Sequence, residues 1–258
     1  MKQSRTVILQ RREKILRMLL EQGEVHVKEL CVLFGTSEIT IRRDLHELEQ
    51  RGLLRRFHGG AQAMHQSHEL LYFEDKRSRR KHEKDLIADT LVEMIEPGTT
   101  VFMNAGTTTL AVMSRIRDYN IRVITNNAMA TTALAGGSAE LICTGGEYQD
   151  RTKSFCGDFA TYIIGNLYAD LCILGVNGVS VAGGITTTFY NETQINELMI
   201  KRCHGKTIIA ADGSKIGKTF CFTCMPLSHV DVLVTDSSAD MNEIEQIKRL
   251  GLKVVIVG

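Results

Sequence analysis

The sequence lacks several features that would place it outside the ordinary globular proteins. It contains no tryptophan and only two prolines in 258 residues, and no apolar run approaches the roughly 18 residues of a membrane-spanning helix. Residues 1–5 lead into a charged helical segment, which is unlike a secretory signal peptide. Seven cysteines, an odd number in a chain without such a signal, indicate reduced thiols and not a disulfide framework. We therefore expect a cytoplasmic protein with no membrane partner, built from one large domain or from a large and a small one.

The chain also lacks a large net charge. Its formal net charge at pH 7 is only +1. Taken over the whole chain, this value argues against a nucleic-acid partner. The charges are unevenly distributed, however: residues 1–60 have a net charge of +4 and the remainder a net charge of −3. This asymmetry indicates a basic module fused to a neutral or slightly acidic one, although a difference of this size also arises by chance.

The apolar residues of the basic N-terminal part are spaced as in helices. Their recurrence every three or four residues predicts three helices, which end near Gly23, Gly35 and Gln50. Ser37 is a suitable N-cap for the third helix. A short strand is predicted before the second helix, and a strand with a glycine turn is predicted at residues 53–60. Three helices followed by a basic hairpin predict a winged helix-turn-helix.

The third helix has an apolar face formed by Ile41, Leu45 and Leu48, and Ile39 lies on the opposite, polar face. An exposed branched side chain in the first turn of a recognition helix can contact a thymine methyl group, and Arg43 on the same face can reach a guanine edge. Nearby hydroxyls and the basic hairpin offer phosphate, base or minor-groove contacts. The alternative is a small helical bundle with a solvated arginine face. The predicted DNA-binding residues are Ser37, Ile39, Thr40, Arg42, Arg43, His46, Arg55, Arg56 and His58.

Two segments of this part have a fixed spacing, namely Arg11-x3-Ile15-x3-Leu19 and, seventeen residues later, Ser37-x2-Thr40-Ile41-Arg42-Arg43-Asp44-Leu45. Together they resemble the helix-turn-helix signature of the DeoR family of bacterial transcriptional regulators. The segment Arg56-Phe57-His58-Gly59-Gly60-Ala61 is similar to that family's wing. Asp44 belongs to the motif, but a carboxylate would repel phosphate. We therefore interpret Asp44 as a structural residue that holds the helix pair.

A linker is predicted at residues 62–80, between a DNA-binding domain at residues 1–61 and an α/β domain at residues 81–258. The linker begins with a polar, aperiodic stretch and ends in the basic run of residues 76–81. The start of a solvated helix explains this run at least as well as a DNA contact does. No metal site is predicted, because neither the histidines at 65, 68 and 82 nor the Cys221-x-x-Cys224 pair has partners at ligand spacing.

From residue 81 onward, short apolar runs alternate with helical segments. Such alternation predicts a parallel sheet that is covered by helices on both faces. Parallel sheets of this kind bind ligands at the carboxyl ends of their strands. The predicted buried strands are residues 100–103, 121–125, 141–143, 171–174, 207–210, 232–234 and 254–257.

Six clusters of glycine, threonine, asparagine or acidic residues are predicted at the ends of these strands. Backbone N–H groups at a helix N-terminus and threonine hydroxyls can bind a phosphate, and Lys215 adds a cation. Asp212, Glu192 and Asn126 can bind sugar hydroxyls. Each cluster alone is weak evidence, because strand-to-helix turns use the same residue types, but together they predict a pocket for a small phosphorylated polyol. The predicted effector-binding residues are Asn104, Gly106, Thr107, Thr108, Thr109, Thr125, Asn126, Gly145, Gly146, Gly178, Thr186, Glu192, Asp212 and Lys215.

The same clusters resemble the effector domain of the DeoR family, which is similar in fold to ribose-phosphate isomerases and commonly senses a sugar phosphate. The resemblance implies an α/β protein in which a winged helix-turn-helix is joined to a Rossmann-like, ribose-phosphate-isomerase-like effector domain. It also implies a repressor of a carbohydrate-utilisation operon, controlled by a phosphorylated sugar or sugar alcohol. The chain departs from the family at Gly175-Val176-Asn177-Gly178-Val179-Ser180, where most relatives have Gly-Ala-Asp-Gly-Ile-Asp.

The loss of both acids weighs against an enzyme. Aldose–ketose isomerisation needs a general base, and neither Asn177 nor Ser180 can serve as one at neutral pH. Glu192 and Asp212 remain, so an isomerase-like enzyme with a DNA-binding appendage is the alternative. We predict no catalytic residues and no cofactor. The expected partners are operator DNA and the effector, and we expect a nucleoid-associated homodimer or homotetramer because one small module buries too little surface for tight specific binding.

Overall fold

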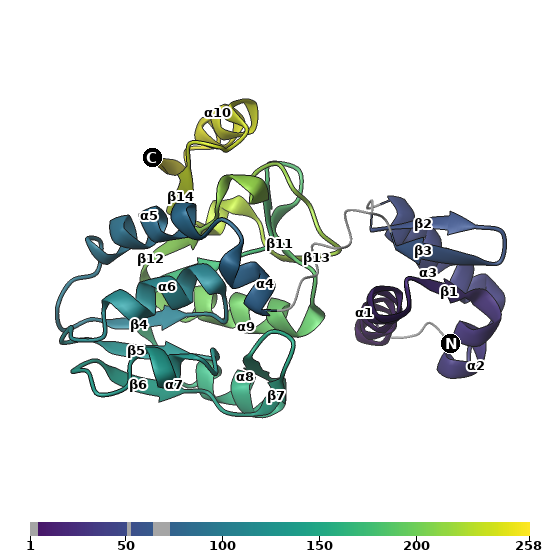
Figure 1. Cartoon of the computed structure of the whole chain (residues 1–258), viewed down its shortest axis with the longest axis horizontal. Coiled ribbons are helices and arrows are strands. Elements are labelled where there is room, and N and C mark those ends of the chain that lie inside the picture. Colours follow the sequence, from purple (N-terminus) through teal and green to yellow (C-terminus); the bar gives the residue numbers. More distant parts are fainter. Residues whose placement is uncertain (1–4, 51–52, 64–72) are drawn as a thin grey trace. The chain divides into compact units, whose positions relative to one another are not determined.

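The computed structural model describes residues 5–50, 53–63 and 73–258. The chain forms two compact units, the first built mainly from the elements up to strand β3 (Gly60–Ala63) and the second from those that begin with helix α4 (Phe73–Ser78) (Figure 1). Each unit has its own buried apolar core. His65 and His68, which sequence analysis sets aside as metal ligands, lie outside the described residues.

The first unit is a winged helix-turn-helix, as predicted. Its helices are α1 (Arg5–Gln22), α2 (Val27–Phe34) and α3 (Glu38–Gln50), and its strands β1 (Glu24–His26), β2 (Leu54–Phe57) and β3 form an antiparallel sheet in the order β1-β3-β2. Helix α2 ends at Gly35, whose left-handed φ of 55° favours glycine. Ile41, Leu45 and Leu48 are buried, whereas Ile39 is 80% exposed, which confirms the predicted faces of α3.

One buried carboxylate joins two helices of this unit. Asp44 on α3 is 2% exposed, and it accepts hydrogen bonds from Arg11 Nε at 2.6 Å and from Arg12 Nε at 2.8 Å, both on α1. Burying a charge is unfavourable unless an opposite charge and hydrogen bonds compensate it, and the two guanidinium groups supply both. The interpretation of Asp44 as a structural residue is confirmed.

The second unit is built around a sheet of seven parallel strands in the order β15-β14-β12-β9-β4-β5-β6. All seven predicted strands are present. They are β4 (Thr100–Met103), β5 (Arg122–Thr125), β6 (Glu140–Cys143), β9 (Ala169–Gly175), β12 (Cys203–Ala210), β14 (Val232–Asp236) and β15 (Lys253–Val257).

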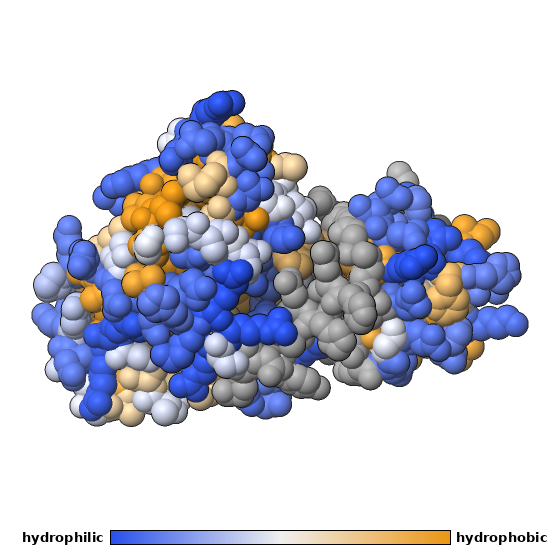
Figure 2. Space-filling model, turned by 45° about the horizontal axis from the view of Figure 1, so that its top comes forward, coloured by the Kyte–Doolittle hydropathy of each residue, from blue (hydrophilic) through white to orange (hydrophobic). Residues whose placement is uncertain are grey.

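Helices cover both faces of this sheet, and each face has its own apolar core. Helices α5 (Lys81–Val92), α6 (Thr107–Arg115) and α7 (Ala130–Ala133) pack on one face, and α8 (Gly157–Gly165), α9 (Tyr190–Lys201) and α10 (Met241–Arg249) pack on the other (Figure 1). Alternation along a strand divides its side chains between the two cores, as in β4, where Val101 and Met103 face α5 and α6 while Phe102 faces α8 and α9. Hydrophilic residues cover most of the surface seen in Figure 2.

Several short elements were not predicted. The hairpin β7 (Glu147–Gln149) and β8 (Ser154–Cys156) precedes α8, and a small sheet contains β10 (Gly178–Ser180), β11 (Gly184–Thr187) and β13 (Phe222–Met225). Helix α4 lies inside the segment for which sequence analysis expects a linker. No helix of the described residues is both long enough and apolar enough to span a membrane.

Replacing Asp44 with asparagine should destabilise the first unit by about 3–5 kcal/mol, because Arg11 and Arg12 then lose the carboxylate that compensates their burial. Amide hydrogen exchange in α1 and α3 of the full-length protein would measure the loss. The matched control is Glu38→Gln, which removes the exposed 3.2 Å ion pair with Arg42 and should cost less than about 0.5 kcal/mol. Equal losses of protection in the two variants would contradict a structural role for Asp44.

Candidate functional site

Helix α3 and the wing present the predicted DNA-binding residues on the surface of the first unit. Arg43, His46, Arg55 and His58 are exposed, as is Ile39. None of these side chains belongs to the apolar core of the unit. They are therefore available to a partner surface.

Four other predicted DNA-binding residues already have partners within the unit. Ser37 caps α3: its hydroxyl accepts from Thr40 N at 3.4 Å and lies 3.1 Å from the Thr40 hydroxyl. Arg42 donates to Glu38 at 3.2 Å. Arg56 is half-buried, and its backbone N–H donates to the Glu49 side chain at 2.9 Å. Some of the hydrogen-bonding groups of these four residues therefore stabilise the helix and the wing.

In the second unit, Asn104 at the end of β4 ties three elements together. Its Nδ2 donates to Gly175 O at 2.7 Å and to Asn196 Oδ1 at 2.8 Å, and its Oδ1 accepts from Gly175 N at 2.9 Å. The side chain is 5% exposed. Its donors and its acceptor are used to hold the end of β4 against the end of β9 and against α9, so the amide acts as a structural clamp.

Asn126, after β5, is a second clamp of this kind. Its Oδ1 accepts from Ala105 N at 2.8 Å, and its Nδ2 donates to Phe155 O at 3.0 Å. The Thr125 hydroxyl accepts from Asn127 N at 3.0 Å. Thr125 and Asn126 thus lie together at the end of β5, as predicted for a strand end. Their polar side-chain atoms form hydrogen bonds that stabilise the turns around this end.

The turn from β4 into α6 provides a helix N-terminus at the same edge of the sheet. The Thr109 hydroxyl donates to Asn104 O at 2.8 Å and accepts from Gly106 N at 3.1 Å, which fixes the turn. Thr107 is half-buried and Thr108 is buried. The first N–H groups of a helix have no acceptor within the helix, so the start of α6 directs donors outward.

Three of the predicted glycine and threonine residues have packing or pairing roles elsewhere in the unit. A Cβ on Gly146 would lie 2.5 Å from Cys156 O, and its φ of 107° is strained for other residues. Gly178 and Thr186 face each other in the β10–β11 hairpin, which follows β9 and lies outside the parallel sheet. Gly145, with a φ of 62°, lies in the turn before β7.

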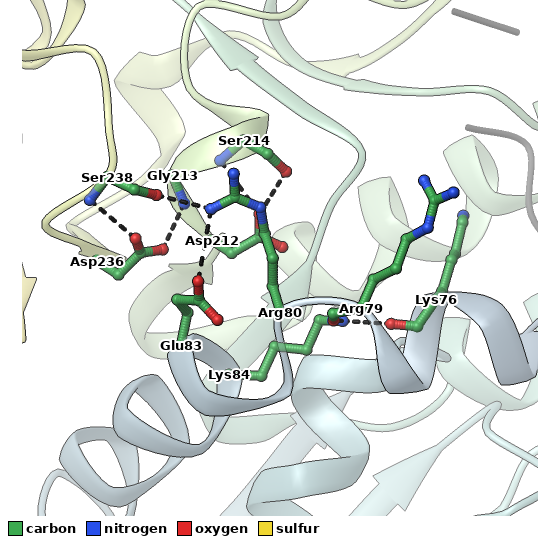
Figure 3. Close-up of polar contacts among 10 residues, drawn as sticks. All are labelled: Lys76, Arg79, Arg80, Glu83, Lys84, Asp212, Gly213, Ser214, Asp236 and Ser238. Atoms are coloured by element: carbon green, nitrogen blue, oxygen red, sulfur yellow. Dashed lines mark hydrogen bonds and ion pairs between the residues drawn. The ribbon is translucent and has the colours of Figure 1, made fainter. Parts of the chain in front are cut away.

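The loop after β12 carries two of the predicted residues, Asp212 and Lys215. Asp212 caps the short turn Gly213–Lys215, and its Oδ1 accepts from Ser214 N at 3.1 Å. Asp236, at the end of β14, accepts from Gly213 N at 2.5 Å (Figure 3). Asp212 is 3% exposed, so its carboxylate shapes the loop, while the half-buried Lys215 follows the turn.

Helix α5 carries a lysine on its buried face that the sequence analysis missed. Lys84 is 7% exposed and lies one turn before the core residue Ile87. Its Nζ donates to the backbone carbonyl of Lys76 and, at 2.5 Å, to that of Arg79 (Figure 3). It therefore holds the end of α4 against the start of α5. The burial of Lys84 could have been predicted from the sequence, because Lys84 has the same helical spacing as Ile87 and Leu91, which are buried.

The electrostatic surroundings of Lys84 are unusual for a lysine. Burial lowers its pKa to about 8; the carboxylate of Asp212 opposes this shift, and the ammonium groups of Lys215 and Lys76 add to it. Lysines from α4 and from the loop after β12 thus both act on Lys84. We refer to Lys76, Lys84 and Lys215 as the lysine cluster.

Arg80 connects the lysine cluster to the strand ends. It precedes α5 with a left-handed φ of 49°, a conformation that costs free energy for any residue other than glycine. Its guanidinium donates to Ser238 Oγ at 2.8 Å and lies 3.7 Å from Glu83 and 3.8 Å from Asp212 (Figure 3). These contacts hold the strained turn in place.

Glu192, in the first turn of α9, is half-buried and accepts a hydrogen bond from Thr187. Burial raises the pKa of Glu192, while the Lys76 ammonium and the Thr187 hydroxyl oppose this shift. Lys76 therefore interacts with both Glu192 and Lys84. In the described part of the chain, no group of three His, Cys, Asp or Glu side chains is placed to hold a metal ion.

Comparisons with known proteins agree with this architecture. Residues 11–67 match the DeoR-like helix-turn-helix domain, and residues 79–237 match the DeoR C terminal sensor domain. The chain is 33% identical over 247 residues to the HTH-type transcriptional regulator GlpR of Haloferax volcanii, covering 95% of this chain and 96% of that protein. It is 32% identical over 230 residues to the glycerol-3-phosphate regulon repressor of Escherichia coli, covering 88% and 90% of the two chains.

A further relative is the lactose phosphotransferase system repressor of Streptococcus mutans, which is 31% identical over 236 residues, or 90% of this chain and 93% of that protein. Among solved structures, the ribose 5-phosphate isomerase A of Methanocaldococcus jannaschii aligns with a TM-score of 0.38 and 14% identity over 52% of this chain and 54% of that chain. The relatives that match nearly the whole chain are transcriptional regulators. The chain belongs to the DeoR family of transcriptional regulators.

Proposed function

We propose that this regulator represses a carbohydrate-utilisation operon and that a phosphorylated sugar or sugar alcohol controls its binding to operator DNA. The observation that carries the proposal is the lysine cluster at the carboxyl edge of the sheet. Burial lowers the pKa of Lys84 to about 8, and the ammonium groups of Lys215 and Lys76 add to this shift, so that a phosphate dianion bound there would be attracted to all three lysines. The names of two relatives point to the same chemistry, since they mention glycerol 3-phosphate and a phosphotransferase system.

The phosphate group would bind between the lysine cluster and the N-terminus of α6. Residues Thr107 to Thr109 offer backbone N–H groups there, and Thr107 and Thr108 offer hydroxyls. Asn104 and Asn126 support this proposed site indirectly, because their amides fix the two strand ends that carry it. In this proposal Asp212 positions Lys215, and Lys76 extends the effector site into the segment before residue 81.

We assign DNA binding to residues 1–61 and effector binding to residues 81–258, with residues 62–80 between them as a linker to which α4 belongs. The operator would be read by a homodimer or homotetramer, since a single small module buries too little surface for tight binding. The effector would act by binding one arrangement of the protein better than another. This function places the protein in the cytoplasm, on the nucleoid.

We further propose that the protein is not an enzyme. An isomerase would need a base near the turn after β9, and neither of the two residues that stand in place of the lost acids can supply one. Ser180 lies 2.7 Å from the Thr219 hydroxyl and accepts from Gly183 N at 3.0 Å, which closes the β10–β11 hairpin. The Asn177 amide has no basic character at neutral pH.

A thermal-shift screen tests the effector proposal. Sugar phosphates should raise the melting temperature, and the same sugars without phosphate should not. Lys215→Gln should weaken binding of the best compound about tenfold, the loss of one charge-assisted contact of about 1.4 kcal/mol. Lys248→Gln, which alters an exposed lysine of α10, is the control and should bind like the wild type. Equal stabilisation by the unphosphorylated sugars would contradict the proposal.

Ligand binding should also take up protons near pH 8. Because the pKa of Lys84 is about 8 in the free protein, this group is half-protonated at that pH, and a bound phosphate would raise its pKa. Titration calorimetry in buffers of different ionisation enthalpy should therefore show an uptake of about half a proton at pH 8 and close to none at pH 7. An uptake that does not change between these two pH values would exclude Lys84 as the linked group.

Two arginine variants test the proposed DNA contacts. Arg43→Ala should reduce discrimination between operator variants by about 1–3 kcal/mol, if its contact to a guanine edge forms. Arg55→Ala should weaken binding to all sequences alike and flatten the salt dependence by about 0.9 per lost phosphate contact. Fluorescence anisotropy with matched duplexes at several salt concentrations measures both effects. Identical behaviour of the two variants would show that the assigned roles are wrong.

A further inference from the structure

One edge of the seven-stranded sheet is open. Strand β15 pairs with β14 in an unbroken parallel register from Lys253 to Val257, and no other strand of the described residues pairs with its second side. An open edge of this kind is a template for another strand. Proteins commonly protect such an edge with prolines, bulges or several charges. Strand β15 has neither a proline nor a bulge, and Lys253 is its one charged residue.

The backbone groups on the open side of β15 follow from one hydrogen bond. The carbonyl of Val257 accepts from Ser237 N, just after β14, at 3.0 Å, so the backbone groups of Val257 point toward β14. Because backbone groups alternate in direction along a strand, those of Val255 also point toward β14. The N–H and C=O groups of Val254 and Ile256 therefore point to the open side.

Apolar side chains accompany these backbone groups. Ile256 is 37% exposed, and Val254, Val255 and Val257 are half-buried. Leu250, in the turn between α10 and β15, is 60% exposed. Figure 2 shows a patch of hydrophobic residues on this side of the second unit, below α10. A partner strand at this edge would therefore bury apolar surface in addition to forming hydrogen bonds.

Helix α10 lies at the position where a second copy of α10 can pack against it. It connects β14 to β15 and covers both strands. Its buried residues Ile244 and Ile247 belong to one apolar core. Leu233 of β14 and Val254 of β15 pack in the same core. If two β15 strands paired, the two α10 helices would lie two strand spacings apart, about 9.6 Å. This separation matches the axial distance of packed helices, about 8–10 Å.

The charges of α10 are complementary to those of an antiparallel copy. Asp240 and Glu243 lie at its start. Lys248 and Arg249 lie in its last turn. A twofold axis at the open edge makes the two helices antiparallel, which places the basic end of each beside the acidic end of the other. This arrangement of charge favours a second copy of the chain as the partner of the edge.

We propose that two copies of the chain associate through β15, and that the two strands pair antiparallel about a twofold axis at Val255 to make one continuous sheet. Val254 of each copy then lies opposite Ile256 of the other, and each such pair exchanges two backbone hydrogen bonds. This inference rests on the proposed homodimer and names its surface. The associated pair supplies two winged helices for one operator.

A cysteine on the twofold axis tests this register. Val255 would lie opposite Val255 of the other copy in a non-hydrogen-bonded pair, with Cα atoms about 4.5 Å apart, which a disulfide can span. Val255→Cys in the full-length protein, oxidised with glutathione disulfide, should therefore give a covalent dimer on a non-reducing gel. Ile256→Cys is the matched control, because the two copies of residue 256 would be diagonal neighbours about 7–8 Å apart, too far for a disulfide. Cross-linking of Val255→Cys that is no stronger than that of Ile256→Cys or of the wild type would overturn the proposal.

Sedimentation velocity tests the same surface without DNA or ligand. The wild type should sediment as a dimer or a tetramer, and Ile256→Lys should have half that mass with an unchanged circular dichroism spectrum, because it places like charges on the paired edge. Phe159→Lys, at a side chain of α8 that is 75% exposed, is the matched control and should keep the wild-type mass.

The outcomes separate this inference from the function on which it rests. An associated wild type whose mass Ile256→Lys does not change would leave the homodimer intact and overturn the β15 surface. Dissociation by Phe159→Lys instead would place the contact at α8 and also overturn it. A wild type that stays monomeric at every concentration would contradict the homodimer itself, whereas the ligand and operator measurements would still test the regulator.

Discussion

The parallel arrangement of seven strands is the constraint on which the second unit depends. It places every strand's carboxyl end at one edge of the sheet, so that residues far apart in the sequence meet there. The meeting is stabilised by side-chain amides: Asn104 joins the ends of β4 and β9 and contacts α9, and Asn126 joins the turns after β4 and β5 to the segment before α8. Because these amides are occupied, the proposed phosphate site is formed by the lysine cluster and the start of α6.

Buried charge has opposite consequences in the two units. In the first, Asp44 is compensated by two arginines at 2.6 and 2.8 Å, and the result is a fixed pair of helices. In the second, Lys84 has two backbone carbonyls as acceptors and two further lysines among the charges that act on it. The carboxylate of Asp212 opposes their effect, yet the pKa of Lys84 is still lowered to about 8. In the proposed function a bound phosphate would supply further negative charge at this site, whereas two arginines already compensate Asp44.

The sequence predicts the parts of this protein that depend on local pattern. The seven strands were predicted because each is a short apolar run, and the faces of α3 were predicted because Ile41, Leu45 and Leu48 recur at helical spacing. The β10–β11–β13 sheet and α4 were missed, because they are short and their pairing or packing depends on distant segments. At the proposed site, the sequence shows which residues are polar but not how their polar atoms are bonded. Nothing in the sequence shows that the Asn104 amide is fully hydrogen-bonded within the protein, or that the Lys76 ammonium group lowers the pKa of Lys84.

In the proposed function one chain couples a phosphorylated ligand to DNA binding, and thermodynamic linkage measures this coupling. The affinity of the full-length protein for operator DNA, selected by the protein from random duplexes, would be measured with and without the sugar phosphate that stabilises it best. Its affinity for that ligand would then be measured with and without operator. We expect both affinities to change by the same factor, between about 5-fold and 150-fold. Ligand binding that leaves the operator affinity unchanged would contradict the account.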